Sequence, residues 1–102
     1  MHAVFMTFTT SVPLEELGTS FTTYADELVH TPGLRSKTWI ADGSTLGGFH
    51  VFDAATDADT FLAGDLFGSI RHNPWFSAFE LRRFDVLEDL TALTSGVSAE
   101  SG

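Results

Sequence analysis

The chain has 102 residues, 43% of them apolar and 13% aromatic, which is typical of one folded domain. Its 14 acidic and 5 basic side chains give a formal net charge of -9, so nucleic acid is not an expected partner. The absence of cysteine excludes disulfides and thiolate chemistry and fits a cytoplasmic protein. We expect neither a membrane span nor a signal peptide, because no apolar run is long enough and no basic region precedes the first one.

Residues 2–9 predict a strand, because β-branched and aromatic side chains dominate there. Met6 lies on one face and Phe5 on the other, which is typical of an inner strand covered on both sides. Pro13 suits the first turn of a helix. Apolar side chains then recur every three or four residues, at Leu14, Leu17, Phe21, Tyr24 and Leu28. The Thr-Pro-Gly sequence at 31–33 ends this helix.

Two more strands are expected at residues 34–41 and 46–52, joined by a hairpin turn at 42–45. Gly47 and Gly48, near the start of the third strand, indicate a bulge or a close approach by another group.

A second helix follows, and Thr56 with Asp59 resembles a capping box at its start. Its inward positions are Ala58, Phe61, Leu62, Leu66 and Ile70. Gly64 and Gly68 weaken the helix, so its second half is expected to be irregular, and the His-Asn-Pro sequence at 72–74 ends it.

The last strand is expected at residues 79–86, followed by a short helix at 87–94 and a frayed polar tail at 95–102. Residues 1–94 therefore form a single domain with the element order β-α-β-β-α-β. This order predicts an α+β, ferredoxin-like sandwich in which both helices cover the same face of the sheet.

The other face of such a sheet would be bare. Strand periodicity suggests that this face carries Phe5, His50 and Phe52. A large exposed apolar patch usually marks an interface or a ligand site. We therefore expect a homodimer in which two sheets face each other and close a dimeric α/β barrel, although a monomer with an open cleft is the alternative.

From Thr31 onward, the chain resembles the YdhR-type monooxygenases of the dimeric α/β-barrel superfamily. The matching residues are Pro32-Gly33-Leu34, Lys37 with Trp39, Gly47-Gly48 leading to Phe52-Asp53, Phe84-Asp85-Val86, and Leu90 with Leu93. The resemblance implies a ferredoxin-like homodimer and a monooxygenase that needs no metal, flavin or other cofactor.

Relatives in this superfamily oxidise aromatic polyketides, degrade haem, isomerise lactones or cyclise polyketides, so the fold alone does not define the chemistry. The haem-degrading relatives use an Asn on the first strand, with a Trp and a His on the second helix. Here the first strand has no Asn, Phe61 stands near the Trp position, and only His72 lies near the His position. Haem degradation is therefore disfavoured.

Oxygenation without a cofactor needs a base, a group that holds the resulting anion, and an apolar enclosure. His50, His72 and Arg82 are the candidate catalytic residues. His50 can instead be a partly buried interface histidine, His72 a residue favoured by a helix dipole, and Arg82 a partner of the many carboxylates.

The candidate substrate-binding residues are mostly aromatic. They are Phe5, Thr7, Trp39, Phe52, Phe61, Trp75, Phe76 and Phe84. Trp39 is chosen through the resemblance, whereas Trp75 and Phe76 could form either a lid or a hydrophobic plug. The four histidines show no close metal spacing, and no serine-hydrolase or phosphate-loop motif is present, so no metal site is expected.

These observations favour a monooxygenase without a cofactor that acts on an aromatic or polyketide-like small molecule. A cyclase or isomerase could use the same pocket, and a module that only binds an apolar ligand is the third reading. Oxygen uptake separates the first reading from the second.

Overall fold

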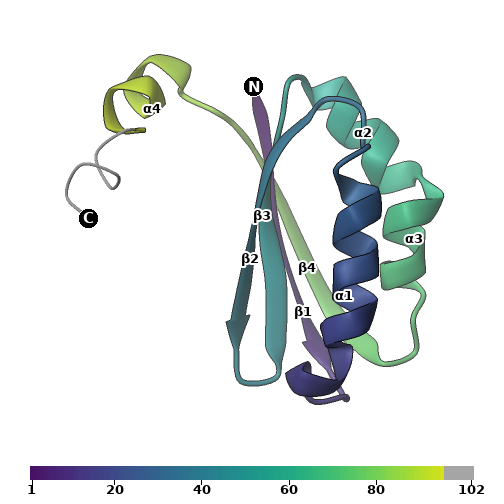
Figure 1. Ribbon diagram of the computed structural model, residues 1–102. Helices are drawn as coiled ribbons and strands as arrows, with labels where there is room; N and C mark the ends of the chain where they lie inside the picture. The colour runs from purple at the N-terminus through teal and green to yellow at the C-terminus, as the bar shows by residue number, and fades with distance from the viewer. Residues whose placement is uncertain (96–102) are drawn as a thin grey trace.

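The computed structural model describes residues 1–95 (Figure 1). Its elements are β1 (His2–Thr10), α1 (Leu14–Leu28), β2 (Leu34–Asp42), β3 (Thr45–Phe52), α2 (Ala55–Ala63), α3 (Asp65–Arg71), β4 (Phe76–Asp85) and α4 (Glu88–Thr94). The α+β, ferredoxin-like order expected from the sequence is confirmed. The predicted polar tail falls largely outside the described residues.

The four strands form one antiparallel sheet in the order β2-β3-β1-β4. Figure 1 shows α1, α2 and α3 together on one side of this sheet and α4 beyond the other side. Among residues 1–95, no helix is long and apolar enough to cross a membrane.

The hydrophobic core lies between the sheet and the three helices. The inward side chains of β1, Val4, Met6 and Phe8, are buried there. Phe8 stacks on Phe79 and lies against Phe76, with ring centroids 5.0 and 4.8 Å apart. The apolar positions of β1 thus hold the inner strand against the helical layer.

The predicted facing of β3 is wrong. In the sheet, Val4 pairs with His50 whereas Phe5 pairs with Phe49. His50 and Phe52 therefore lie under the helices, where they are 1% and 0% exposed. Only Phe5 lies on the uncovered face, because directly paired residues of neighbouring strands share a face.

The second helical segment is broken at Gly64, whose extended backbone ends α2 and begins α3. This confirms the irregularity expected there. The predicted capping box does not form, since Ala54 is the N-cap of α2 and no side chain caps that end. The last strand begins at Phe76, three residues before the predicted start.

Candidate functional site

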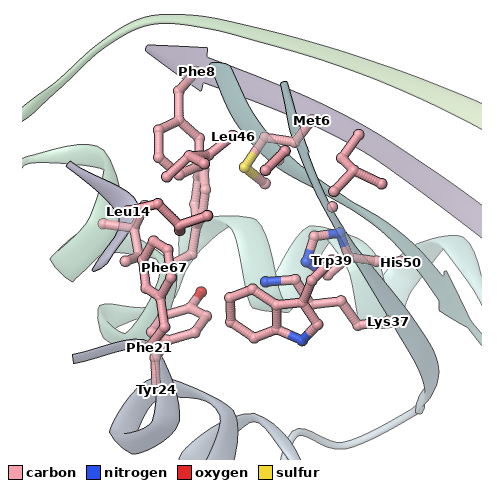
Figure 2. Close-up of a pocket in the computed structure, with 15 residues that line it drawn as sticks. Met6, Phe8, Leu14, Phe21, Tyr24, Lys37, Trp39, Leu46, His50 and Phe67 are labelled. Carbon is pink, nitrogen blue, oxygen red and sulfur yellow. The ribbon is translucent and has the colours of Figure 1, made fainter. Parts of the chain in front are cut away.

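A cavity of about 200 Å³ lies between the sheet and helices α1 and α3. Most of its wall is apolar, and its polar side chains include Tyr24, Lys37 and His50. Figure 2 shows Lys37 and His50 on one side of this space, with Tyr24 opposite them. An apolar enclosure with a few convergent polar groups is the usual form of a small-molecule site.

The sheet side of the cavity is shaped by Gly48. Trp39 pairs with Gly48 across the β2–β3 ladder, and Lys37 pairs with His50. A Cβ atom on Gly48 would lie 2.6 Å from Lys37 Cε and 3.1 Å from His50 Cε1. The missing side chain therefore makes the room that both groups occupy above the strand, which explains the close approach predicted at the glycine pair.

Lys37 is the only lysine in the chain. Its Nζ lies 3.4 Å from the ring centroid of Trp39 and 5.1 Å from that of Tyr24. Within residues 1–95 no carboxylate forms an ion pair with it. Burial lowers the pKa of Lys37 to about 8, because an apolar surrounding disfavours the charged ammonium. The rings of Trp39 and Tyr24 stabilise the ammonium of the molecules in which Lys37 is still protonated.

His50 is buried and its Nδ1 lies 3.3 Å from the backbone carbonyl oxygen of Val4. A carbonyl only accepts, so Nδ1 carries the proton and donates, and Nε2 is left as an acceptor. Burial and then the charge of Lys37 lower the pKa of His50 to about 4, an effect partly offset by the Val4 hydrogen bond. The imidazole is therefore neutral at neutral pH.

Tyr24 completes the polar set from α1 and is 8% exposed. Burial raises the pKa of its hydroxyl, so this group keeps its proton and can donate a hydrogen bond. Figure 2 shows the Tyr24 hydroxyl directed toward the middle of the pocket. The cavity thus combines an amine near its titration point, a neutral imidazole acceptor and a hydroxyl donor.

Four of the predicted site residues lie at or behind this cavity. Trp39 and His50 line it. Phe61 and Phe52 pack behind His50, with ring centroids 5.6 and 6.3 Å from the imidazole. These two phenylalanines hold the imidazole in place rather than contact the cavity.

Four more of the predicted site residues lie on the uncovered face of the sheet. Phe5 pairs with Arg82, Thr7 pairs with Glu80, and Phe84 shares the face of Arg82. The Arg82 guanidinium lies over the Phe84 ring, with Cζ 5.0 Å from its centroid. The expectation that Arg82 and His50 share one pocket is wrong, because the sheet separates them.

The remaining three predicted site residues lie near the end of α3. His72 is the exposed C-cap of that helix and does not line the cavity. Trp75 is 46% exposed, while Phe76 is buried against Phe8 and Phe21. In the part of the chain that the structure describes, no three His, Cys, Asp or Glu side chains are placed to hold a metal ion.

Sequence reasoning missed Lys37 and Tyr24 as site residues. Lys37 stood out only through its spacing to Trp39. The combination that could have identified it is a single lysine, two residues from a tryptophan, on a strand expected to pair with a diglycine. Tyr24 was assigned to the buried stripe of the first helix. This is correct, but the stripe does not indicate that the Tyr24 hydroxyl points into a cavity.

The family described as "Putative mono-oxygenase ydhR" matches residues 4–97. The chain belongs to this family. No curated protein matches it.

Solved structures of the same fold include SnoaB from Streptomyces nogalater, described as a cofactor-independent oxygenase. It is 17% identical over 83% of this chain and 92% of its own, with a TM-score of 0.67. A MhuD mutant with bound manganese protoporphyrin IX is 14% identical over 85% of this chain and 95% of its own, with a TM-score of 0.65. At these identities the structures show the fold alone.

Proposed function

We propose that this member of the ydhR family is an oxygenase that needs no metal or flavin and acts on a small hydroxylated aromatic compound. The observation that carries the proposal is the position of the only lysine, partly buried in an apolar cavity beside a neutral histidine, with no ion-pair partner among residues 1–95. Membership of a mono-oxygenase family supports the reaction class.

The size of the cavity favours a compound of one or two rings. Its volume of about 200 Å³ exceeds the roughly 150 Å³ of an engineered apolar cavity that binds benzene. It is smaller than the roughly 300 Å³ at which pockets for drug-sized ligands begin. A polyketide of several fused rings would therefore need the cavity to widen.

Lys37 is the proposed base in place of His50. A catalytic base is most effective when its pKa lies near the working pH. The pKa of Lys37, about 8, meets this condition, whereas that of His50, about 4, leaves the imidazole too weakly basic. The neutral amine of Lys37 accepts the proton of a substrate hydroxyl, and the resulting ammonium holds the aryl oxide. Nε2 of His50 accepts a hydrogen bond and orients the substrate.

The aryl oxide then transfers electrons to oxygen. In the simplest balanced reaction, a phenol with an unsubstituted para carbon and one O2 become a para-quinone and one water. One oxygen atom enters the ring, the other leaves as water, and the substrate supplies all four electrons. The apolar wall limits the contact of water with the anion and with reactive intermediates.

We also propose that a second copy of the chain covers the uncovered face. Phe49 and Phe84 are 40% and 39% exposed there, and α4 presents Leu90 and Leu93 at 62% and 77% exposure. A wide groove lies between this helix and the sheet. Because the chain is strongly acidic, apolar contact must outweigh charge repulsion between the copies.

Oxygen consumption with a panel of phenols, naphthols and naphthalenediols tests the function. The parent protein, freed of metals, should consume oxygen with at least one of them, and Lys37→Met should lose at least 100-fold in rate. Arg71→Met, which removes an exposed cation from α3, is the matched control and should retain the rate. Product formed without oxygen uptake would instead indicate a cyclase or isomerase.

A further inference from the structure

We infer that the cavity is also a covalent binding site for apolar aldehydes and ketones, with the Lys37 amine as the nucleophile. The inference depends on the cavity geometry and does not depend on the oxygenase reaction. The Lys37 amine would then have a second chemistry, imine formation with a carbonyl ligand, in addition to proton transfer.

The placement of Lys37 is unusual for its residue type. Lysine side chains usually keep the strongly hydrated ammonium in water, whereas Lys37 is only partly exposed. Here the stem crosses the bare backbone of Gly48 and brings Nζ to 3.4 Å from the Trp39 ring centroid. No carboxylate in residues 1–95 forms an ion pair with the amine. Desolvation of this kind is a recognised way to activate a lysine as a nucleophile.

Burial also supplies the reactive form. With the pKa of Lys37 lowered to about 8, roughly 10% of the amine is unprotonated at pH 7, compared with well under 0.1% of a free lysine. An imine is neutral when unprotonated, so its formation removes a charge that the apolar surroundings disfavour.

The step itself balances without a redox partner. The Nζ lone pair attacks the carbonyl carbon, and a carbinolamine forms. The carbonyl oxygen leaves as water with the two amine hydrogens, and a C=N bond remains. Tyr24 lines the same cavity and retains its hydroxyl proton, so it is placed to donate a hydrogen bond to the departing oxygen.

The cavity defines the class of ligand. Its wall is almost entirely apolar and its volume is about 200 Å³, so an aromatic aldehyde or ketone of one or two rings fits and a sugar aldehyde does not. The only other amine known from the sequence is that of Met1, which pairs with Glu88 at the far end of β1.

Reductive trapping tests the inference directly. The parent protein is incubated under nitrogen with 2-naphthaldehyde and cyanoborohydride at pH 7, and the adduct is counted by intact mass and located by proteolysis. We expect one adduct, at Lys37. The double variant Lys37→Arg with Arg71→Lys keeps one lysine but places it on the exposed surface of α3. Its lysine should react at least tenfold more slowly.

A second measurement uses only the parent protein, so it does not depend on the folding of a variant. 2-Methylnaphthalene has the shape of the aldehyde but no carbonyl group, and it should protect Lys37 from labelling. Equal rates at Lys37 of the parent and at the α3 lysine of the double variant, labelling confined to Met1, or labelling of Lys37 that 2-methylnaphthalene does not reduce would each overturn the inference. Because oxygen is absent, these results are independent of the oxygen-uptake assay.

Discussion

Lys37 and His50 are paired positions on β2 and β3, and their side chains share the space left by the missing Cβ of Gly48. Burial lowers the pKa of both groups, and the charge of Lys37 lowers that of His50 further. The two side chains therefore form one polar site inside an apolar wall, in which the charge of Lys37 affects the pKa of His50.

The buried imidazole should make the protein sensitive to mild acid. The pKa of His50 is about 4 in the folded protein and ordinarily about 6.5, so the unfolded chain binds more protons between these values. The neutral buried imidazole contributes fully to stability above pH 6.5. As the pH falls to 4, this contribution is lost, which lowers the free energy of unfolding by on the order of 2–3 kcal/mol. His50→Gln should lose less stability than the parent in urea denaturation between pH 7 and pH 4.5. Exposed His72→Gln is the control and should behave like the parent.

Lys37→Met should stabilise the fold at pH 7. The pKa of Lys37 is about 8 when folded and ordinarily about 10.5, so the stability of the parent rises with pH across this window. The variant lacks this cost, and its gain in the free energy of unfolding should be about 1–3 kcal/mol at pH 7 and shrink toward pH 10. A gain that does not change with pH would mean that the ammonium is not desolvated.

Two glycine-to-alanine changes should have opposite effects. A Cβ at Gly47 would overlap the carbonyl oxygen of Met6 on the neighbouring strand, and backbone cannot move aside without breaking the ladder. Gly47→Ala should cost about 3 kcal/mol. Gly18 lies in α1 with no atom within 4 Å of the added carbon, so Gly18→Ala should stabilise by about 0.5–1 kcal/mol. Thermal or urea unfolding of both variants measures the difference.

A charge on the exposed face of α4 should separate the proposed dimer. Leu90→Glu or Leu93→Glu places a carboxylate where the second copy would bind, and light scattering after gel filtration should then give the mass of one chain. Val29→Glu adds the same charge to an apolar side chain that is 75% exposed beyond the end of α1. That control should leave the mass of two chains unchanged, and a monomeric parent would contradict the proposal.

The element order could be predicted from the sequence because each segment carries a local signal. The apolar stripe of α1, the Asp-Gly-Ser-Thr turn before β3 and the weakening Gly64 each act within a few residues. The observed boundaries differ from the predicted ones by up to three residues, as at the start of β4.

The facing of β3 could not be predicted in the same way. Alternation correctly placed His50 with Phe52, but which face they share depends on the register against β1. Both faces of β1 are apolar, so composition gave no basis for choosing Val4 rather than Phe5 as the partner of His50. The site around Lys37 depends on that register and on a helix from another part of the chain.

The proposed oxygenase reaction is tested most sharply by reacting the metal-free parent protein with an active naphthol under 18O2, followed by mass spectrometry of the product. We expect one labelled oxygen atom in each quinone, an apparent pKa near 8 for the rate, and loss of the labelled product in Lys37→Met. Unlabelled product, or equal labelling by Lys37→Met, would contradict it.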